Sequence, residues 1–314
     1  MTKLVAKPDS VPNTFLGFPF ADDLETLDAD IAILGIPYGK PYGPDELAND
    51  QSRAPDALRQ ATLRPDYMLN SYNFDFGGTL LGDTGAKVVD CGNVIADMSD
   101  PGAHYRNAEA ATRQILNADT SLISIGGDHG IPIPVLRALE AIGEKITLVQ
   151  VDAHIDWRDD VNGEREGYSS PIRRASEMSW IGDIIQIGIR GIGSARPEEV
   201  EIARAYGADI ITAYEMHDIG MQAVLDRIPD GGPYYLTVDA DGLDPTIMPG
   251  VMYQAPGGLS WVQMHKLLHG LFAKGRMVGM DIVEIAPSHD VGNTTLVHAE
   301  RLICNFIGAA ARAR

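Results

Sequence analysis

Three short segments of this 314-residue sequence carry side chains that can bind metal ions. In chain order, these side chains are His129, Asp152, His154, Asp156, Asp239 and Asp241. Carboxylate oxygens suit hard divalent ions, and imidazole nitrogens suit first-row transition metals. Two imidazoles and four carboxylates therefore form a ligand set for a pair of divalent cations such as Mn²⁺. Such a pair can share a water molecule, lower its pKa and supply hydroxide at neutral pH, so the predicted chemistry is hydrolysis.

Each of the three segments follows an apolar run that is typical of a strand buried in a parallel sheet. The ligands of the middle segment alternate along the chain after residues 148–151, which places them on one side of an extended segment. The other ligands follow the runs 122–125 and 234–238, the first after a Gly-Gly pair that permits a sharp turn. The carboxyl ends of parallel strands meet at one edge of the sheet, where open α/β sheets place their sites. The sequence therefore predicts one metal site at that edge.

Strand and helix patterns alternate along the whole sequence. This alternation predicts a single α/β domain over residues 1–314, with a mostly parallel central sheet of about eight strands between two helical layers. The expected strands lie near residues 31–36, 87–90, 121–125, 146–151, 184–189, 208–212, 234–238 and 277–283. The helical patterns include Ala108–Asn117, Pro134–Ile142, Glu198–Tyr206 and Trp261–Phe272.

Composition excludes several classes of partner. The chain has 25 basic and 44 acidic residues, a formal net charge of −19, and no basic run, so nucleic acid and anionic membranes are poor partners. An acidic chain attracts small cationic substrates instead. The two cysteines, Cys91 and Cys304, lie in apolar settings typical of buried free thiols. Residues 1–7 lack a hydrophobic secretion segment and no stretch is long enough to span a membrane, so we expect a cytoplasmic protein.

The three ligand segments resemble the three signatures of the ureohydrolase family, which includes arginase and agmatinase. The matching segments are Gly-Gly-Asp-His at 126–129, Asp-Ala-His-Ile-Asp at 152–156, and Asp-Ala-Asp at 239–241 with the downstream Pro249-Gly250 and Gly257. The resemblance extends over nearly the whole chain and implies the arginase-like fold. It also implies two divalent metal ions, with Mn²⁺ expected and Ni²⁺ as the alternative.

The resemblance also implies a role for individual residues. His129 and Asp156 would bind one metal, and His154 and Asp241 the other, while Asp152 and Asp239 would bridge both. Glu284 would face the guanidinium group of a substrate, because a carboxylate can pair with that planar cation through two parallel hydrogen bonds. Hydroxide would then attack the guanidinium carbon and an amine would leave. We expect catalytic roles for Asp156, Glu284 and Tyr168, and substrate contacts from Glu284, Tyr168 and Trp157.

Two stretches depart from the family pattern. The family carries a histidine, thought to shuttle protons, in the loop after the second signature, and the aligned residue here is Tyr168. A phenol, with an ordinary pKa of about 10, is a poorer proton shuttle at neutral pH than imidazole. Tyr168 is consistent with a leaving group that needs less protonation, with a pocket reshaped for another substrate, or with an inactive protein. Residues 39–52 also depart from the family pattern, and loops at the mouth of a sheet commonly decide specificity.

The leading functional hypothesis is an agmatinase-like hydrolase that releases urea and an amine from a small cationic guanidino compound. The alternative, indicated by Tyr168, is a hydrolase of alkylguanidines or biguanides of the metformin type, with nickel as one candidate metal. A third hypothesis is an inactive metal-binding subunit of a mixed oligomer. The family resemblance implies a homo-oligomer, a trimer or hexamer, and leaves a hetero-oligomer with a related subunit open.

Overall fold

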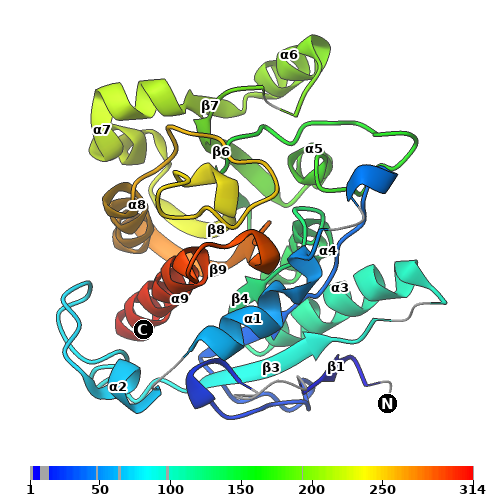
Figure 1. Cartoon of the computed structure of the whole chain (residues 1–314). Helices are drawn as coiled ribbons and strands as arrows, with labels where there is room; N and C mark the ends of the chain where they lie inside the picture. The colour runs from blue at the N-terminus through cyan, green and yellow to red at the C-terminus, as the bar shows by residue number, and fades with distance from the viewer. Residues whose placement is uncertain are drawn as a thin grey trace.

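The computed structural model describes residues 3–7, 14–46, 49–62, 65–96, 99–192 and 194–313. One sheet of nine strands runs through this part of the chain. The strands are β1 (Val5–Ala6), β2 (Ile31–Gly35), β3 (Val88–Val94), β4 (Ser121–Ile125), β5 (Ile146–Val151), β6 (Ile181–Ile189), β7 (Asp209–Thr212), β8 (Gly231–Asp239) and β9 (Gly275–Val283). They lie side by side in the order β1-β3-β2-β4-β9-β8-β5-β6-β7 (Figure 1). Every neighbouring pair is parallel except β1 with β3.

The predicted α/β class with a mostly parallel sheet is confirmed, and all eight strand candidates form strands. Every residue of β2 and of β5 is buried, as expected for parallel strands that are covered on both faces. The ninth strand, β1, was not predicted. It has two residues and pairs antiparallel with β3 at the edge of the sheet, where Val5 lies opposite Val94. Two residues are too few to show the alternation of a strand.

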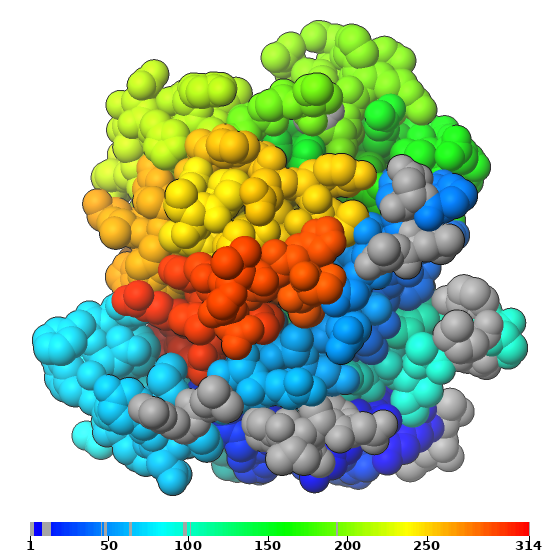
Figure 2. Space-filling view, in the orientation of Figure 1, coloured from blue at the N-terminus to red at the C-terminus, as the bar shows by residue number. Residues whose placement is uncertain are grey.

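Helices cover both faces of the sheet, which gives the three layers predicted from the sequence. The helices are α1 (Ala54–Ala61), α2 (Pro65–Asn70), α3 (Pro101–Asn117), α4 (Pro132–Ala138), α5 (Pro171–Ala175), α6 (Pro197–Tyr206), α7 (Ala213–Arg227), α8 (Trp261–Lys274) and α9 (Thr294–Arg312). One apolar core joins the sheet to α1, α7, α8 and α9, and a second core joins it to α3, α4, α5 and α6. In the space-filling view, α9 lies between the yellow segment that leads from β8 to α8 and the blue segment that contains α1 (Figure 2).

Local sequence signals explain where the helices begin. The Ser260 side chain accepts from the backbone N–H of Gln263, and the Gln263 side chain accepts from the backbone N–H of Ser260, which is a capping box at the start of α8. Asp100 caps α3 in a similar way, with a proline in the first turn. None of the described helices combines the length and the apolar character that a bilayer crossing requires.

The carboxylate of Glu300 makes the stability of the fold depend on pH. Glu300 lies buried on α9, and its Oε1 has no hydrogen-bond partner in the described part of the chain. Burial raises the pKa of Glu300 from 4.5 to about 7. The native state therefore binds more protons than the unfolded chain, and the stability that this group contributes below pH 4.5 is lost as the pH rises through about 7.

We expect Glu300→Gln to raise the free energy of unfolding at high pH relative to low pH. At 1.36 kcal/mol per pKa unit, the upper limit of this gain above pH 7 is about 3 kcal/mol. Urea unfolding at a series of pH values measures the effect. Glu201→Gln on α6, an exposed glutamate paired with Arg204, serves as the matched control and should show no such trend. A gain that is constant with pH would contradict a buried ionisable Glu300.

Candidate metal centre

Four adjacent strands deliver the predicted site residues to one edge of the sheet. These strands are β4, β9, β8 and β5, and all four are parallel. His129 follows β4, Glu284 follows β9, Asp239 ends β8 and Asp152 follows β5. The remaining ligands lie a few residues beyond these ends. The expectation that the three ligand segments meet at the carboxyl edge is therefore correct.

A glycine allows the His129 segment to fold against its neighbour. A Cβ atom on Gly127 would lie 1.6 Å from the backbone oxygen of Tyr38, which is far inside van der Waals contact. The backbone N–H of Asp128 donates to that same oxygen at 2.9 Å, and this hydrogen bond joins the two segments. Only glycine permits this approach, and the turn aims His129 toward the ends of β5 and β8.

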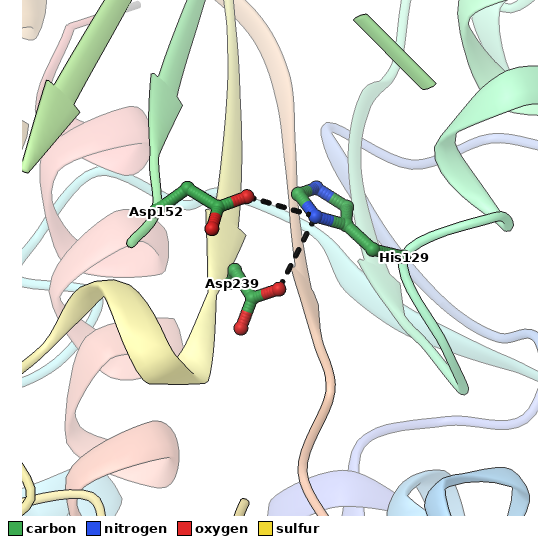
Figure 3. A group of neighbouring side chains, drawn as sticks. All are labelled: His129, Asp152 and Asp239. Atoms are coloured by element: carbon green, nitrogen blue, oxygen red, sulfur yellow. Dashed lines mark ion pairs between the residues drawn. The ribbon is translucent and has the colours of Figure 1, made fainter. Parts of the chain in front are cut away.

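The His129 ring lies among three carboxylates. Its Nδ1 is 3.0 Å from Asp152 Oδ2, 2.7 Å from Asp156 Oδ2 and 3.2 Å from Asp239 Oδ2. Figure 3 shows Asp152 and Asp239 pointing toward this nitrogen from the ends of two strands. Nδ1 is buried, and none of the three contacts has the geometry of a hydrogen bond. A nitrogen lone pair and three oxygens that converge in this way are typical of ligands around one cation.

A second group of ligands adjoins the first. His154 Nδ1 lies 3.4 Å from Asp152 Oδ1 and 3.2 Å from Asp241 Oδ2. Ligand atoms of His129, Asp152 and Asp239 lie within 4.8 Å of one another, and so do those of Asp152, His154 and Asp241. Asp152 belongs to both groups. Two neighbouring cation sites that share a carboxylate fit these positions.

Hydrogen bonds from the surrounding chain fix the shared carboxylate. The Gln150 side chain donates to Asp152 Oδ2 at 2.6 Å, and the backbone N–H of His154 donates to Asp152 Oδ1 at 2.6 Å. Gln186 Nε2 in turn donates to Gln150 Oε1 at 2.5 Å. Gln150 and Gln186 were not singled out in the sequence. Gln150 lies two residues before the predicted ligand Asp152, and Gln186 lies beside Gln150 on the adjacent strand β6. These two positions could have indicated their role.

The electrostatics of the cluster favour added positive charge. Burial and the nearby Asp152 raise the pKa of Asp156 to about 7, and burial with Asp241 and Asp152 raises the pKa of Asp239 well above its ordinary value. Burial would also raise the pKa of Asp152, but the adjacent imidazoles of His129 and His154 hold it below its ordinary value. Four crowded carboxylates are costly to bury without a balancing charge. Two divalent cations supply that balance, so the donor set fits the predicted pair of metals.

Glu284 lies beside this cluster on a left-handed backbone, with φ of 61°. Its Oε1 accepts from the backbone N–H of His129 at 2.7 Å, and its Oε2 accepts from Gln51 Nε2 at 3.1 Å. Burial and the nearby Asp128 raise the pKa of Glu284 to about 8. Asp156 also has a positive φ, 49°. Strained backbone of this kind concentrates at functional sites, where the surrounding structure holds it in place.

A cavity of about 260 Å³ opens over the cluster, and its size suits a small molecule. Its lining includes His129, His154, Asp156, Tyr168, Asp239, Asp241 and Glu284, together with Tyr42, Arg158, Val161, Ser169, Ser194, Val251, Met252 and Tyr253. The structure thus brings Tyr168 and Glu284 together with five of the six predicted metal ligands around one space. Arg158 and Tyr42 were missed in the sequence, although both lie in the loops that depart from the family pattern.

Tyr168 bridges the two departing loops. Its hydroxyl donates to Glu46 Oε1 at 3.0 Å, and its ring lies 4.3 Å from the ring of Tyr42. Glu46 also accepts from the backbone N–H of Tyr42 at 2.8 Å. Burial and the Glu46 hydrogen bond raise the pKa of Tyr168 above its ordinary value. Residues 47–48 of this stretch lie outside the described residues.

Trp157 lies elsewhere than predicted. Its side chain is fully buried, belongs to the core beneath α3, α4 and α5, and has a ring centroid 5.8 Å from that of Tyr206. The predicted substrate contact at Trp157 is therefore corrected. Alternation along the chain does not predict this position, because the left-handed backbone of Asp156 interrupts the extended segment just before Trp157.

Comparisons with known proteins identify the family of the chain. The chain belongs to the arginase family, whose sequence profile matches residues 29–308. It is 30% identical over 324 residues to a guanidinobutyrase of Pseudomonas aeruginosa, covering 95% of this chain and 93% of that protein. A guanidinopropionase of the same organism is 30% identical over 317 residues, with the same coverage. The structure of proclavaminate amidinohydrolase from Streptomyces clavuligerus superimposes with a TM-score of 0.83 at 28% identity, covering 96% of this chain and 97% of that one.

Family membership confirms the predicted ureohydrolase resemblance and the arginase-like fold. It also identifies the chain as a hydrolase of C–N bonds in guanidino or amidino compounds.

Proposed function

We propose that this protein hydrolyses a C–N bond of a small guanidino compound at a pair of divalent cations. The observation that supports the proposal is the convergence of six candidate ligands and Glu284 at one sheet edge, beside a cavity of about 260 Å³. His129 and Asp156 would hold one cation, His154 and Asp241 the other, and Asp152 and Asp239 both. Mn²⁺ is the expected ion and Ni²⁺ the alternative, since mixed oxygen and imidazole ligands suit both.

Glu284 is the group that we propose for guanidinium recognition. Its carboxylate lines the cavity beside the ligands and is held in place by His129 and Gln51. A guanidinium bound there would lie over the cluster with its carbon exposed to attack. Cations bound by the cluster would lower the pKa of a shared water and make hydroxide available. Asp156, a proposed ligand that also lines the cavity, would accept a proton from that water.

The identity of the substrate divides into two candidates. The sequence favours a cation such as agmatine, and the acidic surroundings of the cavity support that proposal. Arg158 supports a second candidate, a guanidino compound that carries a carboxylate. It lines the cavity, and its single described ion pair, with Glu199, is as long as 3.7 Å. The names of two relatives, guanidinobutyrase and guanidinopropionase, indicate substrates of that kind.

A product screen tests the proposed function. The purified chain, loaded separately with Mn²⁺ and Ni²⁺, is incubated with agmatine, arginine, guanidinobutyrate, guanidinopropionate, methylguanidine and a dimethylbiguanide. Urea from agmatine supports the agmatinase-like hypothesis. Urea from the guanidino acids, lost in Arg158→Met, supports the second candidate. An amine released from methylguanidine or the biguanide alone supports the alternative indicated by Tyr168. No turnover despite bound metal would contradict the proposed activity and favour an inactive subunit.

Replacing Tyr168 tests whether it transfers protons. Because the pKa of Tyr168 is raised, the phenol stays neutral at physiological pH, and we expect a pocket-lining role. Tyr168→Phe should change kcat by less than about tenfold, the equivalent of one hydrogen bond, and leave the shape of its pH profile unaltered between about pH 6 and 9. Tyr168→His is the companion variant and should add an inflection near an imidazole pKa. Loss of the basic limb of the profile in Tyr168→Phe would instead identify Tyr168 as a proton carrier.

The remaining expectations stay predictions. They are the single-domain organisation, the trimer or hexamer, the possible second subunit and the cytoplasmic location. Size-exclusion chromatography with light scattering on the purified chain tests the oligomeric state.

A further inference from the structure

A buried chain of hydrogen bonds leads away from the metal-facing side of His129. Its Nδ1 faces the carboxylates, and its Nε2 lies 3.0 Å from Thr237 Oγ1. Thr237 Oγ1 donates to Asp281 Oδ1 at 2.7 Å. The Tyr235 hydroxyl donates to the other oxygen, Asp281 Oδ2, at 2.7 Å. His129, Thr237, Tyr235 and Asp281 are all buried, so water does not compete for these contacts.

The order of the strands brings these groups together. Thr237 and Tyr235 lie two residues apart on β8 and therefore on one face of the sheet. Asp281 lies on the adjacent strand β9 and is paired with Thr237 in the parallel register. Two residues further along each strand, the same register delivers Asp239 and Val283 to the site edge. The hydroxyl–carboxylate pair thus lies one layer beneath the metal ligands.

The direction of the hydrogen bonds determines which nitrogen of His129 carries a proton. A hydroxyl has one proton to donate, and the Thr237 proton is engaged by Asp281. Thr237 Oγ1 can therefore only accept from His129, which places the imidazole hydrogen on Nε2. Nδ1 is then left with a free lone pair, directed at Asp152, Asp156 and Asp239. A histidine metal ligand needs a tautomer and a ring orientation of this kind.

We propose that Thr237 and Asp281 form a positioning relay that holds His129 ready to bind one cation. The inference rests on the two-cation site of the proposed function. A carboxylate fully buried in the middle of a sheet is costly, and its two hydroxyl donors make it tolerable. Among the described residues, no hydrogen bond or ion pair joins Asp281 to a ligand carboxylate, and its connection to His129 runs through Thr237. Thr237 and Asp281 are positioning residues rather than ligands.

Mn²⁺ binding to the metal-free full chain tests the relay. Thr237→Val keeps the shape of the side chain and removes the hydroxyl. We expect it to weaken one of the two Mn²⁺ equivalents about 10- to 100-fold in equilibrium dialysis, the usual effect of losing an outer partner of a ligand. The second equivalent, at His154 and Asp241, should be unchanged. Electron paramagnetic resonance at intermediate Mn²⁺ should then show isolated ions where the wild-type protein shows coupled pairs. Thr237→Ser should restore both readouts.

The control is Thr120→Val, which removes another buried hydroxyl. Thr120 directly precedes β4, at the end of the strand that is opposite to the site. Thr120 donates to the backbone oxygen of Ala29 at 2.7 Å and is remote from the ligands. Thermal melting of each metal-free variant checks that it folds. Unchanged Mn²⁺ binding in Thr237→Val, no rescue by serine, or an equal loss in Thr120→Val would each overturn the relay. Wild-type protein that fails to bind two Mn²⁺ would contradict the proposed function itself, which separates the two failures.

Discussion

Asp152→Asn is expected to abolish both metal uptake and turnover. Asp152 belongs to both groups of ligand atoms, so its charge supports both cations. The amide would also present an N–H either to the donor Nε2 of Gln150 or to the backbone N–H of His154, both of which now donate to the carboxylate. The activity should fall by more than about 100-fold, which is the upper end of the effect for an outer partner of a ligand.

Metal analysis and turnover together measure this effect. Mn²⁺ content after gel filtration should fall close to zero, and excess Mn²⁺ should not restore activity. Asp230→Asn is the matched control, since Asp230 is exposed and pairs with Lys274. Asp230 directly precedes β8, at the end of the strand that is opposite to the site. Full activity of Asp152→Asn with two bound ions would disprove the assignment of the site.

Glu284→Gln is expected to impair substrate recognition while the metals stay bound. Glu284 lines the cavity but is absent from both groups of ligand atoms. Glutamine keeps the shape and removes the charge that would pair with a guanidinium. Losing one partner of a buried charge pair costs about 2–5 kcal/mol, so kcat/KM should fall roughly 30-fold to several thousandfold.

The two readouts of Glu284→Gln distinguish recognition from structure. Steady-state kinetics on the substrate found in the product screen gives kcat/KM, and metal analysis should still find two ions per chain. Glu140→Gln, an exposed glutamate near Arg113, should leave both values unchanged. Simultaneous loss of metal would show that Glu284 supports His129 through its hydrogen bond to the backbone rather than binding substrate.

The sequence was sufficient to predict which candidate ligands gather at one edge of the sheet, because their signals are local. Alternation after an apolar run places Asp152, His154 and Asp156 on one side of the segment. The same alternation places Asp239 and Asp241 on one side of theirs. Each run is long enough to identify a strand, and parallel strands end at a common edge. The layers followed from strands that alternate with helices. Strand β1 was not predicted because a segment of two residues is too short to show an alternating pattern.

Only the tertiary structure decided what surrounds the ligands. Gln51 contacts Glu284, which is 233 positions later in the chain, and the Tyr42–Tyr168 pair joins two loops 126 residues apart (168 minus 42). Trp157 packs into the core directly after the left-handed turn at Asp156, and the pattern of one extended segment does not predict such a turn. The relay from His129 to Asp281 exists because β8 and β9 are neighbours in register. Periodicity is a property of one segment, but side-chain contact depends on strand order and on loop paths, which long-range packing determines.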